Sequence, residues 1–342
     1  MLLLFAAIAL PFVVTACSDK DDDDTDQGGN TPESVTNNVT AGTGSMNSLA
    51  GKFSGSDELM HFLTSLSQQI KHKINGKGDL DDYDEEEIDY TFIYDEATRN
   101  LVKIESVCDG DYTEFDFTNP NLVVLTIDNG LKINLGVSYN EDGYISKIEQ
   151  DYSYEALSDD GTINYGTARN KSSHNFTYVD GYLTSYTQTY SSSEYYEDGE
   201  PYELEGTDSY TLEWADGTLN KVTYESQDED DTFKQIWMAD YSSDSEIDNS
   251  SLQWEGMTSI PFVSELNIPF FYLNLLGKAS NKIPYVWRFS YIYNGEYLYN
   301  NIAGSYADET NYTDFSLVSE SVGNATQVGS YSYFTTFTYD ED

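Results

Sequence analysis

The chain has 342 residues and is strongly acidic, with 16 Lys and Arg against 61 Asp and Glu and a formal net charge of −45. Proteins bind phosphate backbones with basic surfaces, so this charge excludes nucleic acid as a partner. The chain has only two cysteines, too few for a cysteine cluster around zinc, and we expect no metal and no cofactor. Its 30 tyrosines and 16 phenylalanines favour a pleated, half-buried sheet.

Residues 1–16 form an apolar run that ends in Val-Val-Thr-Ala and is followed by Cys17. The run is short for a membrane span and suits the core of a signal peptide. Small residues directly before a cysteine resemble the lipobox of bacterial lipoproteins. This resemblance implies that Cys17 is acylated, as by palmitate, and becomes the mature N-terminus. The alternative is an ordinary cleaved signal peptide with an incidental cysteine.

Residues 17–55 are predicted to be an acidic, disordered lipoprotein tether. The segment opens with Ser-Asp-Lys-Asp-Asp-Asp-Asp-Thr-Asp and continues in Gly, Asn, Thr and Ser. The acidic run also resembles the surface-export signal of Bacteroides-type lipoproteins. We therefore expect an outer membrane lipoprotein that faces the cell exterior and contacts the membrane through the lipid on Cys17.

Residues 56–74 are predicted to form an amphipathic helix that packs on a sheet. Ser56 is a plausible cap, and Gly76 follows the last turn. Apolar residues recur at helical spacing along the segment. These residues are Leu59, Phe62, Leu63, Leu66, Ile70 and Ile74.

A recurring phrase organises the rest of the chain. In residues 176–186, alternating aromatic runs flank Asp180-Gly181, which is a signal for a two-residue hairpin turn. The phrase recurs around Asp142-Gly143 and Asp216-Gly217, and residues 92–104 hold a degenerate copy. The short connections leave no room for crossover helices and predict an antiparallel meander.

Residues 56–342 are therefore predicted to be one all-β domain, a large antiparallel meander sheet that is strongly curved or barrel-like. Residues 158–170 and 195–205 are expected to be loops. A short apolar helix is expected near 262–277, covering one end of the sheet, with Gly277 as its stop. Strands are expected near 88–95, 100–108, 111–118, 121–128, 131–140, 143–155, 174–180, 182–191, 206–215, 218–226, 231–239, 284–294, 311–319 and 329–339.

The last residues, Phe337-Thr-Tyr-Asp-Glu-Asp342, repeat the opening half of the hairpin phrase and stop before its glycine. We therefore expect the sequence to be truncated at the C-terminus.

Together, these phrases resemble Bacteroides-type surface lipoproteins that carry a domain of unknown function, type 4595. The resemblance also rests on Phe271-Tyr-Leu-Asn-Leu-Leu-Gly-Lys-Ala-Ser-Asn-Lys-Ile-Pro284 and would cover about residues 80–342. The family offers no catalytic residues to carry over.

The sequence predicts a binding protein and not an enzyme. His174 is the only histidine in the predicted sheet region, and no Gly-x-Ser-x-Gly elbow is present. Tyr182, Tyr186 and Tyr190 are candidate ligand-binding residues, because exposed rings on a strand can stack on sugars. We expect a non-catalytic surface lipoprotein that binds an extracellular ligand such as a glycan. The alternatives are tyrosines that only pack cross-strand pairs, and a structural or assembly component with an envelope protein as its partner.

Overall fold

The computed structural model describes residues 35–46, 52–54, 60–75, 84–108, 111–127, 130–158, 162–196, 199–227, 232–241, 247–248, 273, 275–278, 280, 282–283, 286–293, 296–304, 314–322 and 328–339. Every helix or strand assigned in these residues is a β-strand. The strands are β1 (Val35–Asn37), β2 (Lys52–Ser54), β3 (Met60–Asn75), β4 (Asp84–Tyr94), β5 (Leu101–Cys108), β6 (Asp111–Asp116), β7 (Leu122–Ile127), β8 (Lys132–Tyr139), β9 (Ile145–Leu157), β10 (Asn164–Val179), β11 (Tyr182–Tyr195), β12 (Pro201–Ala215), β13 (Thr218–Gln227), β14 (Thr232–Asp240), β15 (Ile247–Asp248), β16 (Lys282–Ile283), β17 (Val286–Tyr293), β18 (Glu296–Gly304), β19 (Asp314–Val322) and β20 (Val328–Tyr339).

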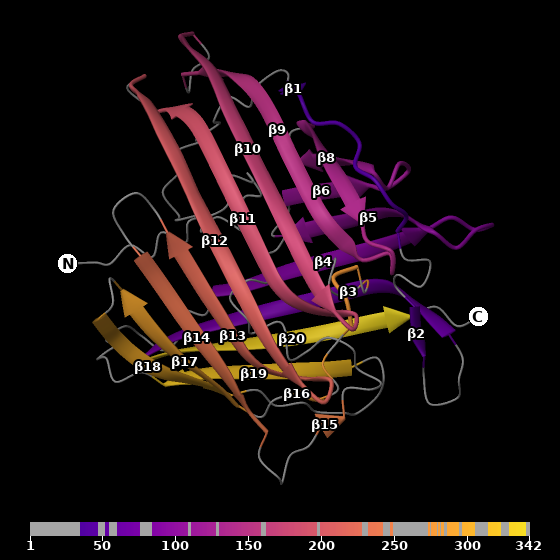
Figure 1. Ribbon diagram of the computed structural model, residues 1–342, viewed down its shortest axis with the longest axis vertical. Coiled ribbons are helices and arrows are strands. Elements are labelled where there is room, and N and C mark those ends of the chain that lie inside the picture. The colour runs from indigo at the N-terminus through magenta and orange to yellow at the C-terminus, as the bar shows by residue number, and fades with distance from the viewer. Residues whose placement is uncertain are drawn as a thin grey trace.

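The main sheet is an antiparallel meander, which confirms the predicted all-β class. Each strand from β4 to β14 pairs with the next one along the chain. Strands β17, β18, β19 and β20 extend the same order after β14. β20 also pairs with β3, and β3 pairs with β4. Figure 1 shows the long strands β9–β12 side by side, with β14, β17 and β18 beyond them.

The two faces of the sheet differ in polarity. On β10, Ser172, His174 and Phe176 are buried, whereas Lys171 and Asn175 at the alternate positions are exposed. The apolar core lies on the buried face, mainly on β4–β9, and includes Ile104, Leu125, Ile133, Leu135 and Ile145. Charged, Ser and Thr side chains dominate the opposite face of β9–β13. In the described strands β9–β13, the sheet therefore presents a water-compatible outer surface.

The helix expected over 56–74 is wrong for the described residues, which form strand β3 from Met60 to Asn75. The apolar positions Phe62, Leu66, Ile70 and Ile74 are four residues apart. That spacing fits one face of a helix and also one face of a strand, since four is an even number. Pairing along both edges, with β20 and with β4, decides for the strand.

Residues 35–46 of the segment predicted as a disordered tether lie on the sheet. β1 pairs with β9, and residues 38–46 continue along the sheet. Gly42 N–H donates to Asn121 O at 2.7 Å, and Tyr139 N–H donates to Thr43 O at 2.8 Å. A Cβ on Gly42 would lie 2.2 Å from Val137 O, so only glycine allows this close approach. Residues 35–46 are therefore a fixed strap, and not disordered chain.

Several sequence expectations lie outside the described residues. These are the signal peptide of residues 1–16, Cys17, and most of the apolar segment near 262–277. Among the described residues, no helix is long and apolar enough to cross a membrane.

Strands β10, β11 and β12 reach further than predicted, into both segments expected to be loops. β10 begins at Asn164, β11 ends at Tyr195, and β12 begins at Pro201. The added residues are mostly Ser, Thr, Asn and Glu, so they lack the apolar alternation that identifies a strand.

Two of the predicted Asp-Gly hairpin turns are confirmed, whereas the turn at Asp142-Gly143 is longer, with β8 ending at Tyr139, β9 beginning at Ile145 and a positive φ at Gly143 alone of the two. Asp180 and Gly181 have φ of 53° and 84°, and Asp216 and Gly217 have φ of 52° and 75°. Positive φ at both central residues matches the right-handed twist of the flanking strands and favours Asp-Gly. In each hairpin the strand register shifts beside an aromatic residue just before the turn, at Tyr178 in β10 and at Trp214 in β12.

These aromatic residues tie each hairpin to the one before it. Tyr178 Oη donates to Ile145 O at 2.6 Å, and Trp214 Nε1 donates to Leu183 O at 2.7 Å. Both acceptors come two residues after the glycine of the preceding hairpin turn. Tyr139 Oη likewise donates to Pro120 O, in the preceding turn at the same end of the sheet, at 2.9 Å. We call these hydrogen bonds the aromatic latches.

Replacing Tyr178 with Phe tests the latch. The variant loses the hydroxyl donor and leaves Ile145 O without it, so we expect the free energy of unfolding to fall by about 1–2 kcal/mol. Urea unfolding measures the change. Tyr182→Phe is the matched control and should change stability little, because no described residue makes a hydrogen bond with that hydroxyl. Equal losses in both variants would contradict a specific latch.

Candidate functional site at the hairpin turns

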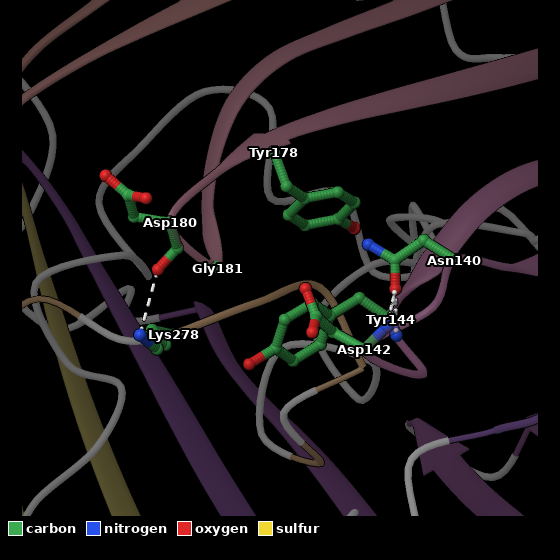
Figure 2. Close-up of a pocket in the computed structure, with 7 residues that line it drawn as sticks. All are labelled: Asn140, Asp142, Tyr144, Tyr178, Asp180, Gly181 and Lys278. Atoms are coloured by element: carbon green, nitrogen blue, oxygen red, sulfur yellow. Dashed lines mark hydrogen bonds between the residues drawn. The ribbon is translucent and has the colours of Figure 1, made fainter.

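A cavity of about 430 Å³ lies between two adjacent hairpin turns, and we call it the turn pocket. Figure 2 shows its lining, with Asn140 on one side and Asp180 and Lys278 on the other. The β8–β9 turn, the β10–β11 hairpin and the segment after Gly277 all contribute. The lining residues are Asn140, Asp142, Tyr144, Tyr178, Asp180, Gly181 and Lys278.

Asn140 shapes one wall of the turn pocket. Its Oδ1 accepts hydrogen bonds from the backbone N–H of Asp142 at 3.0 Å and of Tyr144 at 2.9 Å. This Asx-type arrangement holds the turn and fixes the direction of the residues after it. Asp142 is exposed, so its carboxylate is open to a ligand or to water.

Lys278 forms the opposite wall. Its backbone N–H donates to Gly181 O at 2.8 Å, and its Nζ donates to Asp180 O at 2.8 Å. The ammonium also lies 5.3 Å from the centroid of the Tyr182 ring, within cation–π range. A Cβ on Gly181 would lie 2.8 Å from Lys278 Cε, so the glycine leaves room for this side chain.

The segment that carries Lys278 crosses the turns of three hairpins. Ile145 N–H donates to Leu275 O at 2.7 Å, and Leu219 N–H donates to Ser280 Oγ at 3.1 Å. Leu273, Leu275 and Leu276 are buried in the core. For its described residues, this confirms the expectation that the apolar segment covers one end of the sheet.

Aromatic rings pair between neighbouring hairpins. Tyr144 packs against Tyr178 with ring centroids 5.4 Å apart, and Tyr182 packs against Trp214 at 4.8 Å. In both pairs, the residue directly after a turn glycine contacts the latch aromatic of the next hairpin. The turn pocket therefore has a rigid aromatic wall beside its carboxylates, its amide and its ammonium.

The candidate tyrosines lie in two different environments. Tyr182 is half-buried beside the turn pocket, next to Lys278. Tyr186 and Tyr190 are only 2% and 8% exposed, so the expectation of solvent-facing rings is wrong for both. Period-two alternation groups the residues of a strand into two faces but does not say which face is inside.

Tyr186 belongs to an aromatic ladder on the inner face. Its ring stacks on Phe176 at 4.9 Å and on Tyr210 at 5.1 Å. Tyr210 in turn stacks on Tyr224 at 4.7 Å. These are cross-strand neighbours on adjacent strands, so the ladder stabilises the sheet as such pairs ordinarily do.

A buried polar network adjoins this ladder. His174 Nδ1 lies 2.8 Å from Tyr186 Oη, which donates to Gln188 Oε1 at 3.2 Å. His174 Nε2 lies 3.2 Å from Ser172 Oγ. Burial lowers the pKa of His174 from 6.5 to about 3, so the imidazole is neutral at physiological pH. Among the described residues, no hydrogen-bond partner is found for the Nε2 groups of Gln150 and Gln188, an unusual state for buried amides.

Sequence reasoning identified the turns that line the pocket, but it predicted none of the lining residues as ligand-binding residues. Asn140 and Asp142 belong to a recognised hairpin phrase, and only their role as pocket walls was not predicted. Lys278 carried no signal, since it meets Asp180 across 98 residues of chain. In the described residues, no three His, Cys, Asp or Glu side chains are close enough together to hold a metal ion.

No protein-family model matches the sequence, and no curated protein matches it significantly. Among solved structures, the chain is similar to a crystal structure described as that of a porin-like protein from Bacteroides uniformis. The two are 14% identical with a TM-score of 0.49, over 81% of this chain and 98% of that chain. The family resemblance inferred from the sequence remains a prediction.

The buried histidine predicts a loss of stability in acid. Between pH 6.5 and about 3 the unfolded chain binds a proton at His174 that the folded chain does not, so stability falls as pH falls through this window. At about 1.4 kcal/mol per pKa unit, the loss amounts to roughly 3–5 kcal/mol.

Urea unfolding of the wild type and of His174→Gln at pH 7, 5 and 4 measures this contribution. Carboxylates titrate in both proteins, so the difference between them isolates the histidine. Parallel pH profiles would contradict the assignment.

Proposed function

We propose that this protein is a non-catalytic surface lipoprotein that binds a glycan in the turn pocket. The observation that supports this is the combination of two tyrosine rings, two carboxylates and an amide around one cavity. Sugar rings present an apolar C–H face that packs on aromatic rings, and hydroxyl groups that hydrogen-bond to carboxylates and amides. The volume is in the range of small-molecule sites.

The charges of the turn pocket favour a neutral sugar. Asp142 and Asp180 contribute two carboxylates, against the single ammonium of Lys278. That ammonium is already engaged with Asp180 O and the Tyr182 ring. A carboxylated or sulfated sugar would meet net negative charge, whereas neutral hydroxyl groups would find acceptors.

The state of the buried histidine supports a binding role over a catalytic one. His174 is 1% exposed and is not among the residues that line the turn pocket. With a pKa of about 3 it is a poor general base near neutral pH.

We further propose that the domain stands in water outside the bilayer, on the cell exterior, and is held to the outer membrane by lipid on Cys17. The polar outer face of β9–β13 supports this, because strands that face lipid carry an apolar outward band. The acidic residues after Cys17 and the strap at residues 35–46 leave a tether between the lipid and the sheet.

We also propose that the meander curves into a barrel. The pairings of β20 with β3, and of β3 with β4, support closure because they join the last strands to the first ones. Closure would remove the open edges at which sheets aggregate.

Glycan binding is tested with the full chain in detergent on a glycan array, followed by titration of the best neutral glycan. We expect Tyr144→Ala to weaken binding about tenfold by removing the stacking ring. Tyr196→Ala is the matched control, since its exposed ring lies at the opposite end of the long strands. An array with no bound glycan would count against the proposal and favour an envelope assembly role, in which pull-down from membranes recovers a stoichiometric protein partner.

The lipid anchor is tested by Cys17→Ser. Without the thiol no acyl chain can be attached there, so we expect the protein to move from the membrane fraction to the soluble fraction. Cell fractionation and surface proteolysis provide the readout. A variant that stays in the membrane fraction would refute anchoring through this cysteine.

A further inference from the structure

Strands β9–β12 project beyond their neighbours at the end away from the turn pocket. Figure 1 shows their far ends extending past β13 and β14. β11 pairs with β12 as far as Tyr195 and Pro201, whereas β13 pairs with β12 only from Thr207 onward. Among the described residues, only β11 is hydrogen-bonded to residues 201–206 of β12.

The opposite edge of this projection is protected. On β9, the residues Tyr152–Tyr154 lie beyond the last pairing with β8, and β1 pairs with them. A three-residue strand thus covers one edge of the projection. Within the described residues, no strand pairs with residues 201–206 of β12 at the other edge. Unpaired backbone groups of this kind are templates for strand addition.

The open edge has two chemically distinct faces. Glu203 and Glu205 are exposed on the outer face. Tyr202 and Leu204 point to the other face, and Leu204 is 52% exposed. The Tyr202 ring lies 4.5 Å from the ring of Tyr196. An added strand would therefore meet carboxylates at alternate positions on one side and the side chains of Tyr202 and Leu204 on the other, where the Tyr202 hydroxyl already donates to Glu194 Oε2 at 2.9 Å.

The surrounding charge selects the partner. No Lys or Arg lies between Lys171 and Lys221 in the sequence. A second copy of this chain pairing edge to edge would bring Glu203 and Glu205 close to their own counterparts, and like charges on facing strands repel. The occupant is instead a strand whose outward side chains are cationic.

We infer that residues 201–206 of β12 form a strand-addition site for an extended segment of a partner protein in which Lys or Arg alternates with apolar residues. Backbone hydrogen bonds hold the segment in register. Glu203 and Glu205 pair with its cations, and Tyr202 and Leu204 pack against its apolar residues.

The probe is a fluorescent, capped nonapeptide of alternating Lys and Val, compared with its Glu–Val counterpart by anisotropy with the full chain in detergent. We expect the wild type to prefer the Lys–Val peptide at least tenfold. The double variant Glu203→Lys/Glu205→Lys should reverse this preference, because both cross-strand charge pairs change sign.

A matched variant, Glu96→Lys/Glu141→Lys, changes the net charge equally at exposed turns on the other end of the sheet. It should bind the Lys–Val peptide like the wild type. If both double variants bound this peptide equally weakly, the peptide would be attracted by the overall negative charge and not by the β12 edge, and the proposal would be wrong. The second measurement is the binding of two Lys–Val peptides that are N-methylated at alternate residues, one for each of the two possible patterns. N-methylation removes backbone N–H donors, so the pattern that blocks the edge-facing N–H groups should abolish binding. Undiminished binding of both methylated peptides, or no binding of the unmodified one, would overturn the proposal.

Discussion

The hairpin-turn end of the sheet depends on one kind of contact, the aromatic latch. In each latch, an aromatic side chain of one hairpin donates a hydrogen bond to the backbone of the preceding hairpin. Tyr178 and Trp214 make it to equivalent carbonyls, two residues after a turn glycine. Burial raises the pKa of Tyr178 well above its ordinary value, so its hydroxyl remains a donor at all physiological pH values. Each latch fixes the distance between neighbouring turns, and the turn pocket lies in the space so defined. Tyr178 makes one of the latches and also lines the turn pocket, so the same side chain holds the hairpins together and shapes the candidate site.

Polarity divides the long strands into two regions with different roles. Near the hairpin turns their inner face joins the apolar core, through residues such as Leu183 and Leu212. Farther along, the same face carries Ser172, His174 and Gln188, which are buried but polar. Hydrogen bonding and ring stacking there replace apolar burial, and beyond them the strands project past their neighbours. The negative charge of Glu203 and Glu205 on this projection opposes the pairing of its edge with a second copy of the chain.

The hairpins were predictable because their determinants are local. Asp-Gly needs only two residues to adopt positive φ, and the flanking alternation extends for a few residues on either side. β3 was mispredicted because apolar residues four apart satisfy both a helix and a strand. The turn pocket was predictable only in part, since Lys278 reaches Asp180 from 98 residues away and no local pattern marks such a meeting.

By itself, the sequence determined the all-β class, the meander order and the positions of the tight turns, because turn chemistry and period-two alternation are encoded within a few residues. Only the tertiary structure decided which face of each strand is inside, as the burial of Tyr186 and Tyr190 shows. It also decided that residues 35–46 lie on the sheet, and which segment closes the hairpin end. These outcomes depend on contacts between residues far apart in the chain, whose free energies exist only when the whole sheet has assembled.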